Sequence, residues 1–316
     1  MDHKQLGRSG IAVAPWCFGG NVFGWTADEA TSFRLLDAFV EAGFGFIDTA
    51  DVYSKWVPGH VGGESEAVIG RWMKARRNRD RLVIATKVGM MREAGQDNLA
   101  KAHIVDSVDA SLKRLQTDHI DLYQSHQDDP SRPVEEPLDV YAGLIEAGKV
   151  RAIGASNFSA ERFAEALDAS ASSGLPRYET LQPEYNLYAR EGFEGALQKA
   201  CLDHGVGVIP YFSLAGGFLT GKYRSEKDFG KSARGGGMSR YLNDRGLRIL
   251  AGLDAVAARH GVEPAQVALA WLAAQPGIAA PIASATSIEQ LQSLVAAARL
   301  RLPADDLAEL DRASAP

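Results

Sequence analysis

The sequence contains the run Phe46-Ile47-Asp48-Thr49-Ala50-Asp51-Val52-Tyr53, in which an apolar stretch ends in a carboxylate and a tyrosine follows five residues later. A short apolar run bounded by polar residues is typical of a strand that is buried on both faces. A strand that ends at Asp48, with Tyr53 on the loop behind it, brings a carboxyl group and a phenol to the same edge of a sheet.

Two more predicted strands end in ionisable side chains. An ammonium group ends the run Leu82-Val83-Ile84-Ala85-Thr86-Lys87, and an imidazole ends the run Ile120-Asp121-Leu122-Tyr123-Gln124-Ser125-His126. In a parallel α/β barrel the active site lies at the carboxyl ends of the strands. We therefore expect Lys87 and His126 to converge with the carboxylate and the phenol of the first run.

Short apolar runs alternate with longer amphipathic segments along the chain. Strands are predicted over residues 16–20, 44–48, 82–87, 120–124, 150–154, 180–183, 206–210 and 278–282. Helices are predicted over residues 28–42, 64–76, 103–116, 135–148, 159–172, 192–204, 263–274 and 287–298. Eight strand–helix units in succession favour parallel strands joined by crossovers, and eight such units predict an α/β fold closed into a (β/α)8 TIM barrel.

Three segments lie outside this eightfold pattern. Residues 4–14 are predicted to form an N-terminal hairpin that plugs the bottom of the barrel. Residues 243–260 and 303–313 predict extra C-terminal helices. Because no linker-like tract divides the chain, we interpret residues 1–316 as a single barrel domain.

Composition argues against several classes of function. The chain is 46% hydrophobic and has a formal charge of −6, so it has no general attraction for nucleic acid or for an anionic membrane. The two cysteines, Cys17 and Cys201, form no CxxC pair, and neither a metal site nor a disulfide framework is expected. We recognise no secretory leader or membrane-spanning run and expect a cytoplasmic protein. The sequence carries no signature of an oligomeric state.

The four converging side chains can together move a proton. A tyrosine has a pKa of about 10 and is a poor acid at neutral pH unless a cation favours its phenolate. Lys87 is expected to lower the pKa of Tyr53, and Asp48 to pair with Lys87 and hold it. Tyr53 is then a general acid for a carbonyl oxygen that His126 orients. Taken singly, each residue has an ordinary structural interpretation, such as a helix cap or a half-buried wall, so the catalytic interpretation depends on their joint placement.

The residues at or just after the ends of the predicted strands 150–154, 180–183 and 206–210 suit a flat aromatic ligand that carries an amide. Ser156 and Asn157 follow a predicted strand and Gln182 ends the next, so their side chains can bond a carboxamide. Tyr211 can stack on an aromatic ring. Each of these signals is weak alone, since a Ser-Asn pair before a helix is usually only a cap.

Two further segments suit anions. Residues 213–223 contain Gly216-Gly217, whose backbone N–H groups can cradle phosphate oxygens with Lys222 nearby. Residues 222–248 hold eight basic and three acidic residues, an excess that suits a polyanionic ligand, although a solvated loop is the ordinary alternative. Residues 282–290 predict a strand end followed by a helix start, and helix N-termini bind phosphate.

Together these residues resemble the aldo-keto reductase superfamily over about residues 4–310. The motifs are Phe46-Ile47-Asp48-Thr49-Ala50 with Tyr53, Gly63-Glu64-Ser65-Glu66, Thr86-Lys87, Gly154-Ala155-Ser156-Asn157-Phe158, Gln182-Pro183-Glu184-Tyr185-Asn186 and Gly217-Phe218-Leu219-Thr220-Gly221-Lys222. The chain is most similar to the bacterial branch that also resembles potassium-channel β subunits. The resemblance implies a (β/α)8 barrel, NADPH bound without a Rossmann motif, and a catalytic tetrad of Asp48, Tyr53, Lys87 and His126.

The resemblance also implies the cofactor contacts. Those to the nicotinamide are Ser156, Asn157, Gln182 and Tyr211. Those to the pyrophosphate are Ser213, Leu214, Gly216, Leu219 and Lys222, and those to the adenosine end are Ser284, Thr286, Ser287 and Gln290. The chain departs from NADPH-preferring relatives at Gln290 and at Ser293-Leu294, where a partner for the 2′-phosphate is lost. Basic residues of the 227–240 loop can compensate, so NADPH is the expected cofactor and NADH the alternative.

We interpret the chain as an NAD(P)H-dependent oxidoreductase that reduces aldehydes or ketones to alcohols, or catalyses the reverse. Trp25 and Trp56 are predicted to line a pocket for a carbonyl compound or a sugar, although a loop tryptophan is as often a packing anchor. Two alternatives stay open. One is a barrel isomerase or aldolase that uses Lys87 as a Schiff-base amine, and the other is an NADPH-binding regulatory subunit with slow turnover.

Overall fold

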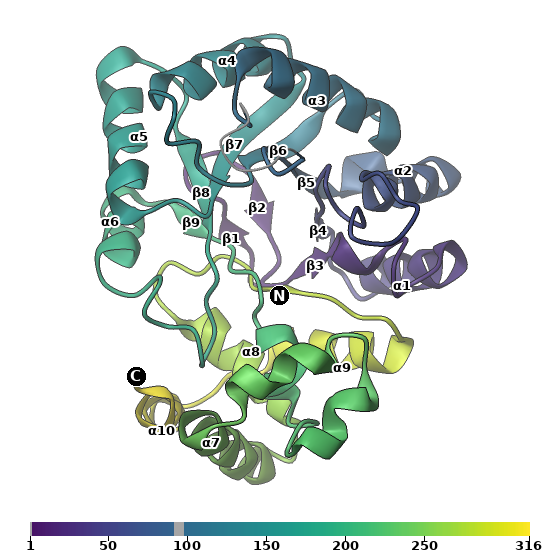
Figure 1. The fold of residues 1–316 in the computed structure, drawn as a ribbon, viewed down its shortest axis with the longest axis vertical. Coiled ribbons are helices and arrows are strands. Elements are labelled where there is room, and N and C mark those ends of the chain that lie inside the picture. Colours follow the sequence, from purple (N-terminus) through teal and green to yellow (C-terminus); the bar gives the residue numbers. More distant parts are fainter. Residues whose placement is uncertain (1, 92–97) are drawn as a thin grey trace.

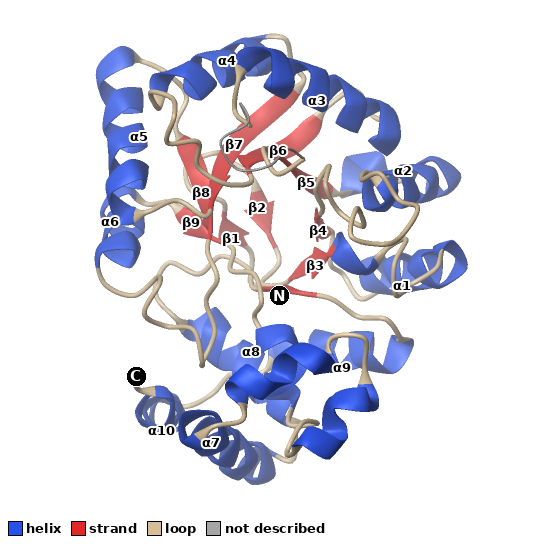
Figure 2. Ribbon diagram, viewed as in Figure 1, coloured by secondary structure: helices blue, strands red, loops and turns tan. Residues whose placement is uncertain are grey.

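The computed structural model describes residues 2–91 and 98–316. Figure 1 and Figure 2 show a central sheet with helices around its outer side. Within the described ranges, no helix has both the length and the apolar character needed to cross a membrane.

The strands of the central sheet follow one another in chain order. They are β3 (Cys17–Gly19), β4 (Phe46–Asp48), β5 (Val83–Val88), β6 (Ile120–Ser125), β7 (Val150–Ser156), β8 (Tyr178–Gln182), β9 (Gly207–Val208) and β10 (Ile282–Ala283). Their hydrogen-bonded order is β10-β3-β4-β5-β6-β7-β8-β9, and each neighbouring pair is parallel. All their carboxyl ends therefore lie at one end of the sheet.

Backbone hydrogen bonds between β9 and the segment before β10 close the sheet. The Val208 N–H donates to Gly277 O at 3.0 Å, and the Ala279 N–H donates to Val208 O at 2.7 Å. Beyond them, the Ile282 N–H donates to Pro210 O at 2.9 Å. The predicted (β/α)8 barrel is therefore confirmed.

Helices that follow the strands cover the outside of the barrel. They are α1 (Glu29–Glu41), α2 (Glu64–Arg76), α3 (Lys101–Leu115), α4 (Glu135–Glu146), α5 (Ala160–Ser173), α6 (Ala196–His204), α8 (Pro264–Ala274) and α9 (Ile288–Arg299). Side-chain caps fix several of their starts: Asp28 accepts from the N–H of Thr31, and Ser159 accepts from the N–H of Arg162. The left-handed Gly205 ends α6, where a residue without a Cβ is unstrained.

The N-terminal hairpin closes one end of the barrel, as predicted. It pairs β1 (Lys4–Gln5) with β2 (Ala12–Val13) in antiparallel fashion. The buried hairpin side chains are Leu6, Ile11 and Val13, and they share one apolar cluster with Cys17, Phe46, Ala85, Leu122 and Ala152 from the strands. The plug fits closely, since a Cβ on Gly7 would lie 2.3 Å from the carbonyl oxygen of Glu179.

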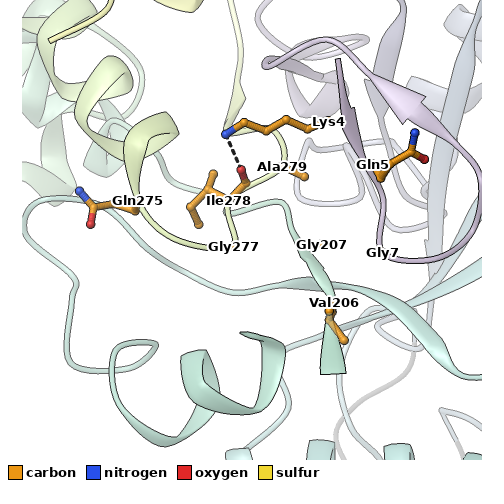
Figure 3. Close-up of a pocket in the computed structure, with 10 residues that line it drawn as sticks. Lys4, Gln5, Gly7, Val206, Gly207, Gln275, Gly277, Ile278 and Ala279 are labelled. Atoms are coloured by element: carbon orange, nitrogen blue, oxygen red, sulfur yellow. Dashed lines mark hydrogen bonds between the residues drawn. The ribbon is translucent and has the colours of Figure 1, made fainter. Parts of the chain in front are cut away.

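A cavity of about 310 Å³ lies beside this plug, at the end of the barrel opposite Asp48. Figure 3 shows Lys4 reaching across it. The Lys4 ammonium donates to Ala273 O at 2.9 Å and to Ile278 O at 2.8 Å. These bonds tie the start of the chain to the segment before β10, so the Lys4 ammonium is already engaged in holding the barrel together.

The extra C-terminal helices are also present. They are α7 (Asp244–His260) and α10 (Ala304–Ser314), which pack against each other, and α7 also packs on α8. Three short 3₁₀ segments that the sequence patterns do not predict follow β9. They are η3 (Ala215–Thr220), η4 (Glu226–Lys231) and η5 (Gly235–Tyr241).

Four strands are shorter than predicted. Cys17–Gly19 and Phe46–Asp48 form strands where 16–20 and 44–48 are predicted. Regular pairing covers only Gly207–Val208 of the range 206–210, and only Ile282–Ala283 where 278–282 was expected. Pro210 and Pro281 lack the N–H that would extend each ladder. Ile278 still forms an isolated bridge with Val208, so the shortened strands do not open the barrel.

We expect Leu6→Ala to destabilise the whole barrel, because Leu6 is fully buried in the plug. Truncating a buried leucine typically costs about 2–5 kcal/mol. Urea denaturation of Leu6→Ala beside Gln5→Ala, an exposed neighbour, provides the measurement. Equal unfolding free energies for the two variants would contradict the role of the hairpin as a plug.

Candidate active site

Alternation along the strands puts the candidate residues inside the barrel. Phe46, Ala85 and Leu122 lie in the interior cluster beside the hairpin. Two residues further along a strand, the side chain points to the same face. Those next positions are Asp48, Lys87 and Gln124, which are all buried. The interior is therefore apolar beside the hairpin and polar toward the carboxyl ends of the strands.

A buried ion pair links β4 to β5. Lys87 Nζ lies 2.6 Å from Asp48 Oδ2, and the two side chains are 0% and 1% exposed. The ammonium also donates to Thr49 O at 2.9 Å and to the Tyr53 hydroxyl oxygen at 3.0 Å. The Tyr53 hydroxyl in turn donates to Asp48 Oδ2 over 3.4 Å. Three of the four predicted catalytic residues thus form one hydrogen-bonded cluster.

Two amides hold the other carboxylate oxygen of Asp48. Gln124 Nε2 donates to Oδ1 at 3.1 Å, and Gln182 Nε2 donates to it at 3.0 Å. Gln182 therefore uses its amide on Asp48, although the predicted partner is a carboxamide of a ligand. The motifs do not single out Gln124, but its place two residues before His126 on an inward strand face is the signal that identifies it.

His126, the fourth predicted residue, directly follows β6 and lies beside Tyr53. The two ring centroids are 6.0 Å apart. The side chain is buried, and Nδ1 has no hydrogen-bond partner among residues 2–91 and 98–316. Burial, reinforced by the positive charge of Lys87, lowers the pKa of His126 well below its ordinary value. The imidazole is therefore neutral at physiological pH.

Burial has the largest effect on the acidity of Tyr53. It raises the pKa of Tyr53 to about 12, with Lys87 acting to lower that pKa and Asp48 to raise it. The lowering expected from Lys87 is present, but it is smaller than the cost of burying a phenolate. Burial also acts to lower the pKa of Lys87, but Asp48 and Tyr53 outweigh it, so this pKa is raised. At neutral pH the phenol is protonated and the lysine is charged.

The predicted nicotinamide contacts form a connected group beside His126. Asn157 has a φ of +56°, and its Nδ2 donates to His126 O at 2.8 Å. The Tyr211 hydroxyl donates to Asn157 Oδ1 at 2.8 Å. Ser156 Oγ donates to Gln182 O at 2.8 Å. The ends of β7 and β8 and the segment after β9 therefore present these four residues together.

The predicted pyrophosphate contacts lie on and around η3. They are Ser213, Leu214, Gly216, Leu219 and Lys222. Gly216 and Gly217 have φ values of +66° and +107°, which glycine adopts without strain. Ser213 Oγ donates to Pro210 O at 3.1 Å, and the Leu219 side chain is fully buried while Leu214 is half-buried. Leu219 is therefore packed into the protein in this structure, unlike the more exposed Leu214 and Lys222.

Two cations of the segment after β9 lie against aromatic rings. Lys222 Nζ is 5.1 Å from the ring centroid of Tyr223. Arg234 Cζ is 5.4 Å from the ring centroid of Trp25, which comes from the loop after β3. Burial lowers the pKa of Arg234, while Tyr53 and Tyr223 act to raise it. Arg234 therefore places a guanidinium within electrostatic range of the tetrad.

The predicted adenosine contacts surround the start of α9. Ser284 Oγ donates to Gly19 O at 2.7 Å, which ties β10 to β3. The Thr286 N–H donates to Gln290 Oε1 at 2.9 Å. Ser287 caps α9 by accepting from the N–H of Gln290. Thr286, Ser287 and Gln290 are thus held by one another at the N-terminus of a helix.

The predicted pocket tryptophans stand next to Tyr53. The rings of Trp25 and Trp56 are 5.5 Å apart, and that of Trp56 is 6.0 Å from Tyr53. Trp56 is 48% exposed. An aromatic surface therefore adjoins the ring of Tyr53.

Comparisons with known proteins agree on one family. The model of the Aldo/keto reductase family matches residues 15–315. The chain is 34% identical over 305 residues to Aldo-keto reductase YhdN of Bacillus subtilis, covering 93% of this chain and 88% of the relative. It is 32% identical to Protein tas of Escherichia coli, covering 98% and 97%. It is 33% identical to a probable voltage-gated potassium channel subunit beta of Arabidopsis thaliana, covering 92% and 89%.

We expect His126 to remain neutral at pH 5, because burial and Lys87 both oppose its protonation. Nitrogen-15 NMR of the histidine rings, assigned with His126→Gln, measures this directly. Since the pKa is lower in the folded than in the unfolded protein, the stability that neutral His126 contributes is present above pH ~6.5 and is lost as the pH falls below it. A ring that titrates near pH 6.5 would contradict this expectation.

Proposed function

The chain belongs to the aldo/keto reductase family, and from this premise we propose that it transfers hydride between a nicotinamide cofactor and a carbonyl compound. The proposal rests on the 3.0 Å contact between the Tyr53 hydroxyl and Lys87 Nζ at the carboxyl ends of the strands. A protonated phenol beside a fixed positive charge suits the protonation of an oxygen on which negative charge develops. The reaction is the reduction of an aldehyde or ketone to an alcohol, or its reverse.

Each member of the tetrad has one task in this mechanism. Tyr53 donates its proton to the carbonyl oxygen and becomes a phenolate, which the Lys87 ammonium stabilises. Asp48 keeps Lys87 in place, and neutral His126 orients the oxygen through a hydrogen bond. A bound nicotinamide supplies the hydride, so that a C–H and an O–H bond form as the C=O π bond breaks.

The residues after β7, β8 and β9 fit an extended dinucleotide. Asn157 and Tyr211 offer an amide and an aromatic ring beside His126, and the glycine pair of η3 suits the approach of phosphate oxygens. We propose NADPH as the cofactor, because the excess of basic residues in the 222–248 segment favours the additional negative charge of a 2′-phosphate. NADH is the alternative, since Gln290 carries no charge.

Other residues support a substrate class and a cell compartment. Trp25 and Trp56 suit an aldehyde, a ketone or a sugar of moderate size. Cys17 and Cys201 are buried free thiols, which supports a reducing, cytoplasmic setting. The charge of −6 favours neither nucleic acid nor an anionic membrane as a partner.

A regulatory role is the second candidate. It is favoured by the similarity to a probable potassium channel subunit beta, and it would combine NADPH binding with slow turnover. Single-turnover hydride transfer to ordinary aldehydes distinguishes the two, because it is fast only for an enzyme. The Schiff-base alternative is disfavoured, because the Lys87 amine is bonded to Asp48, Thr49 O and Tyr53 and has a raised pKa.

We expect Tyr53→Phe to lower kcat at least about a hundredfold, which is the usual scale for loss of a general acid. Fluorescence titration should show that NADPH still binds. The matched control is Tyr185→Phe, which removes a phenol bonded to Glu194 away from the tetrad. Near wild-type turnover of a reactive aldehyde by Tyr53→Phe would overturn the assignment of the acid.

We expect Gln290→Arg to strengthen NADPH binding about tenfold or more, corresponding to about 1.4 kcal/mol, and to strengthen NADH binding less. The reason is that residue 290 is exposed in the first turn of α9, beside the predicted adenosine contacts, where a guanidinium offers charge to a 2′-phosphate. Fluorescence titrations with both cofactors measure the effect, with Gln198→Arg on the outer helix α6 as the control. Equal changes for the two cofactors would show that a charge at residue 290 does not read the 2′-phosphate.

A further inference from the structure

Asp51 is a buried carboxyl group outside the tetrad. It lies between Asp48 and Tyr53 in sequence and is 2% exposed. Among residues 2–91 and 98–316, neither of its carboxyl oxygens has a hydrogen-bond partner of normal geometry, although the Val52 N–H is close enough to act on it. A charged carboxylate in such a place costs far more than a neutral one.

A second buried carboxyl group, that of Glu66 on α2, acts on Asp51. Glu66 Oε1 accepts from the Thr86 hydroxyl at 2.6 Å, and Oε2 accepts from Arg114 Nε at 2.6 Å. Glu66 therefore has the donors that stabilise a charged form, and Asp51 lacks them. If one proton resides on this pair of like groups, it belongs on Asp51.

A buried phenol also faces this region. The Tyr123 hydroxyl of β6 has no hydrogen-bond partner within the described part of the chain. Burial raises the pKa of Tyr123, and Tyr141, Asp51 and Glu66 add to this effect. The charged groups that act on Asp51 are Glu66 from α2, Arg114 from α3 and Lys87 from β5. Burial, with Glu66 adding to it, raises the pKa of Asp51 to about 7.

The backbone around Asp51 connects it to the tetrad. The Asp51 N–H donates to Lys87 O at 3.3 Å, and the Tyr53 N–H donates to Ala50 O at 3.2 Å. The loop is also tightly confined, since a Cβ on Gly62 would lie 2.8 Å from the carbonyl oxygen of Asp51. The backbone of Asp51 is therefore held between Lys87 and Gly62, within the segment that carries Tyr53.

We propose that Asp51 is a positioning residue that works as a neutral carboxylic acid, and that its ionisation displaces the 49–54 loop and impairs proton transfer by Tyr53. The kinetic part of this inference rests on the proposed function. The protonation state of Asp51 does not, because it concerns the folded protein alone.

Thermal melts of Asp51→Asn at several pH values test the protonation state. The pKa of Asp51 in the folded protein, about 7, is above its ordinary value of 3.8. Its contribution to stability is therefore fully present below pH 3.8 and is lost as the pH rises through about 7. Asparagine is neutral at every pH, so the melting temperature of the variant relative to the wild type should be several degrees higher at pH 8 than at pH 5.

The matched control is Asp37→Asn, which changes an aspartate whose pKa is lowered chiefly by a hydrogen bond from Arg76. Its loss of stability should be nearly constant between pH 5 and pH 8. A pH-independent difference for Asp51→Asn, or a larger deficit at pH 8 than at pH 5, overturns the proposal, because a charged Asp51 would then be stabilising.

The pH profile of kcat/KM tests the effect on Tyr53. The kcat/KM of Asp51→Asn divided by that of the wild type should increase at least about threefold from pH 6 to pH 8.5. The increase should come from kcat and not from cofactor binding. A flat ratio overturns the positioning role. The melts need no catalysis, so they test the protonation state of Asp51 even if the proposed reaction is wrong. The Tyr53→Phe experiment reports separately on the proposed reaction.

Discussion

The buried pair of Lys87 and Asp48 is the interaction on which the rest of the site depends. Both side chains are almost fully removed from water, and removing one partner of such a pair typically costs about 3–5 kcal/mol. The pair is tolerable because two glutamine amides, a backbone carbonyl and the phenol satisfy its remaining hydrogen-bonding groups. The same bonds fix the ammonium beside the Tyr53 hydroxyl, so a requirement of stability also sets the geometry of the chemistry.

Side chains along a strand point alternately into and out of the barrel, and this alternation explains how a polar site can exist inside an apolar barrel. The inward positions carry Phe46, Ala85 and Leu122 near the hairpin and charged or amide side chains two residues later. Each of these three strands thus contributes one apolar and one polar position to the interior of the barrel. This separation lets a large core and a dry, hydrogen-bonded site share the same strands without an unpaired charge in the core.

Much of this arrangement could be predicted from the sequence, because the strand ends and helix caps are local signals. The meeting of Asp48, Lys87 and Tyr53 follows from their positions at strand ends. Gln124 is not singled out by the motifs because its strand also carries the polar residues Asp121 and Ser125, and only the alternation of the strand shows that Gln124 points into the barrel. The segments η3, η4 and η5 have no local periodicity, and the shortened strands β9 and β10 depend on single prolines. The raised pKa of Tyr53 could not be predicted, because it reflects burial by residues distant in sequence.

The hairpin plug has a consequence for the order in which the chain assembles. Its residues are synthesised before those of the barrel strands, yet the carbonyl oxygens that bind the Lys4 ammonium belong to residues 269 and 274 positions later. Contacts of such long sequence separation form slowly, because the entropy of closing the loop must be overcome first. The hairpin therefore cannot complete its contacts until the segment before β10 has been synthesised, and incompletely packed apolar side chains favour aggregation during that interval.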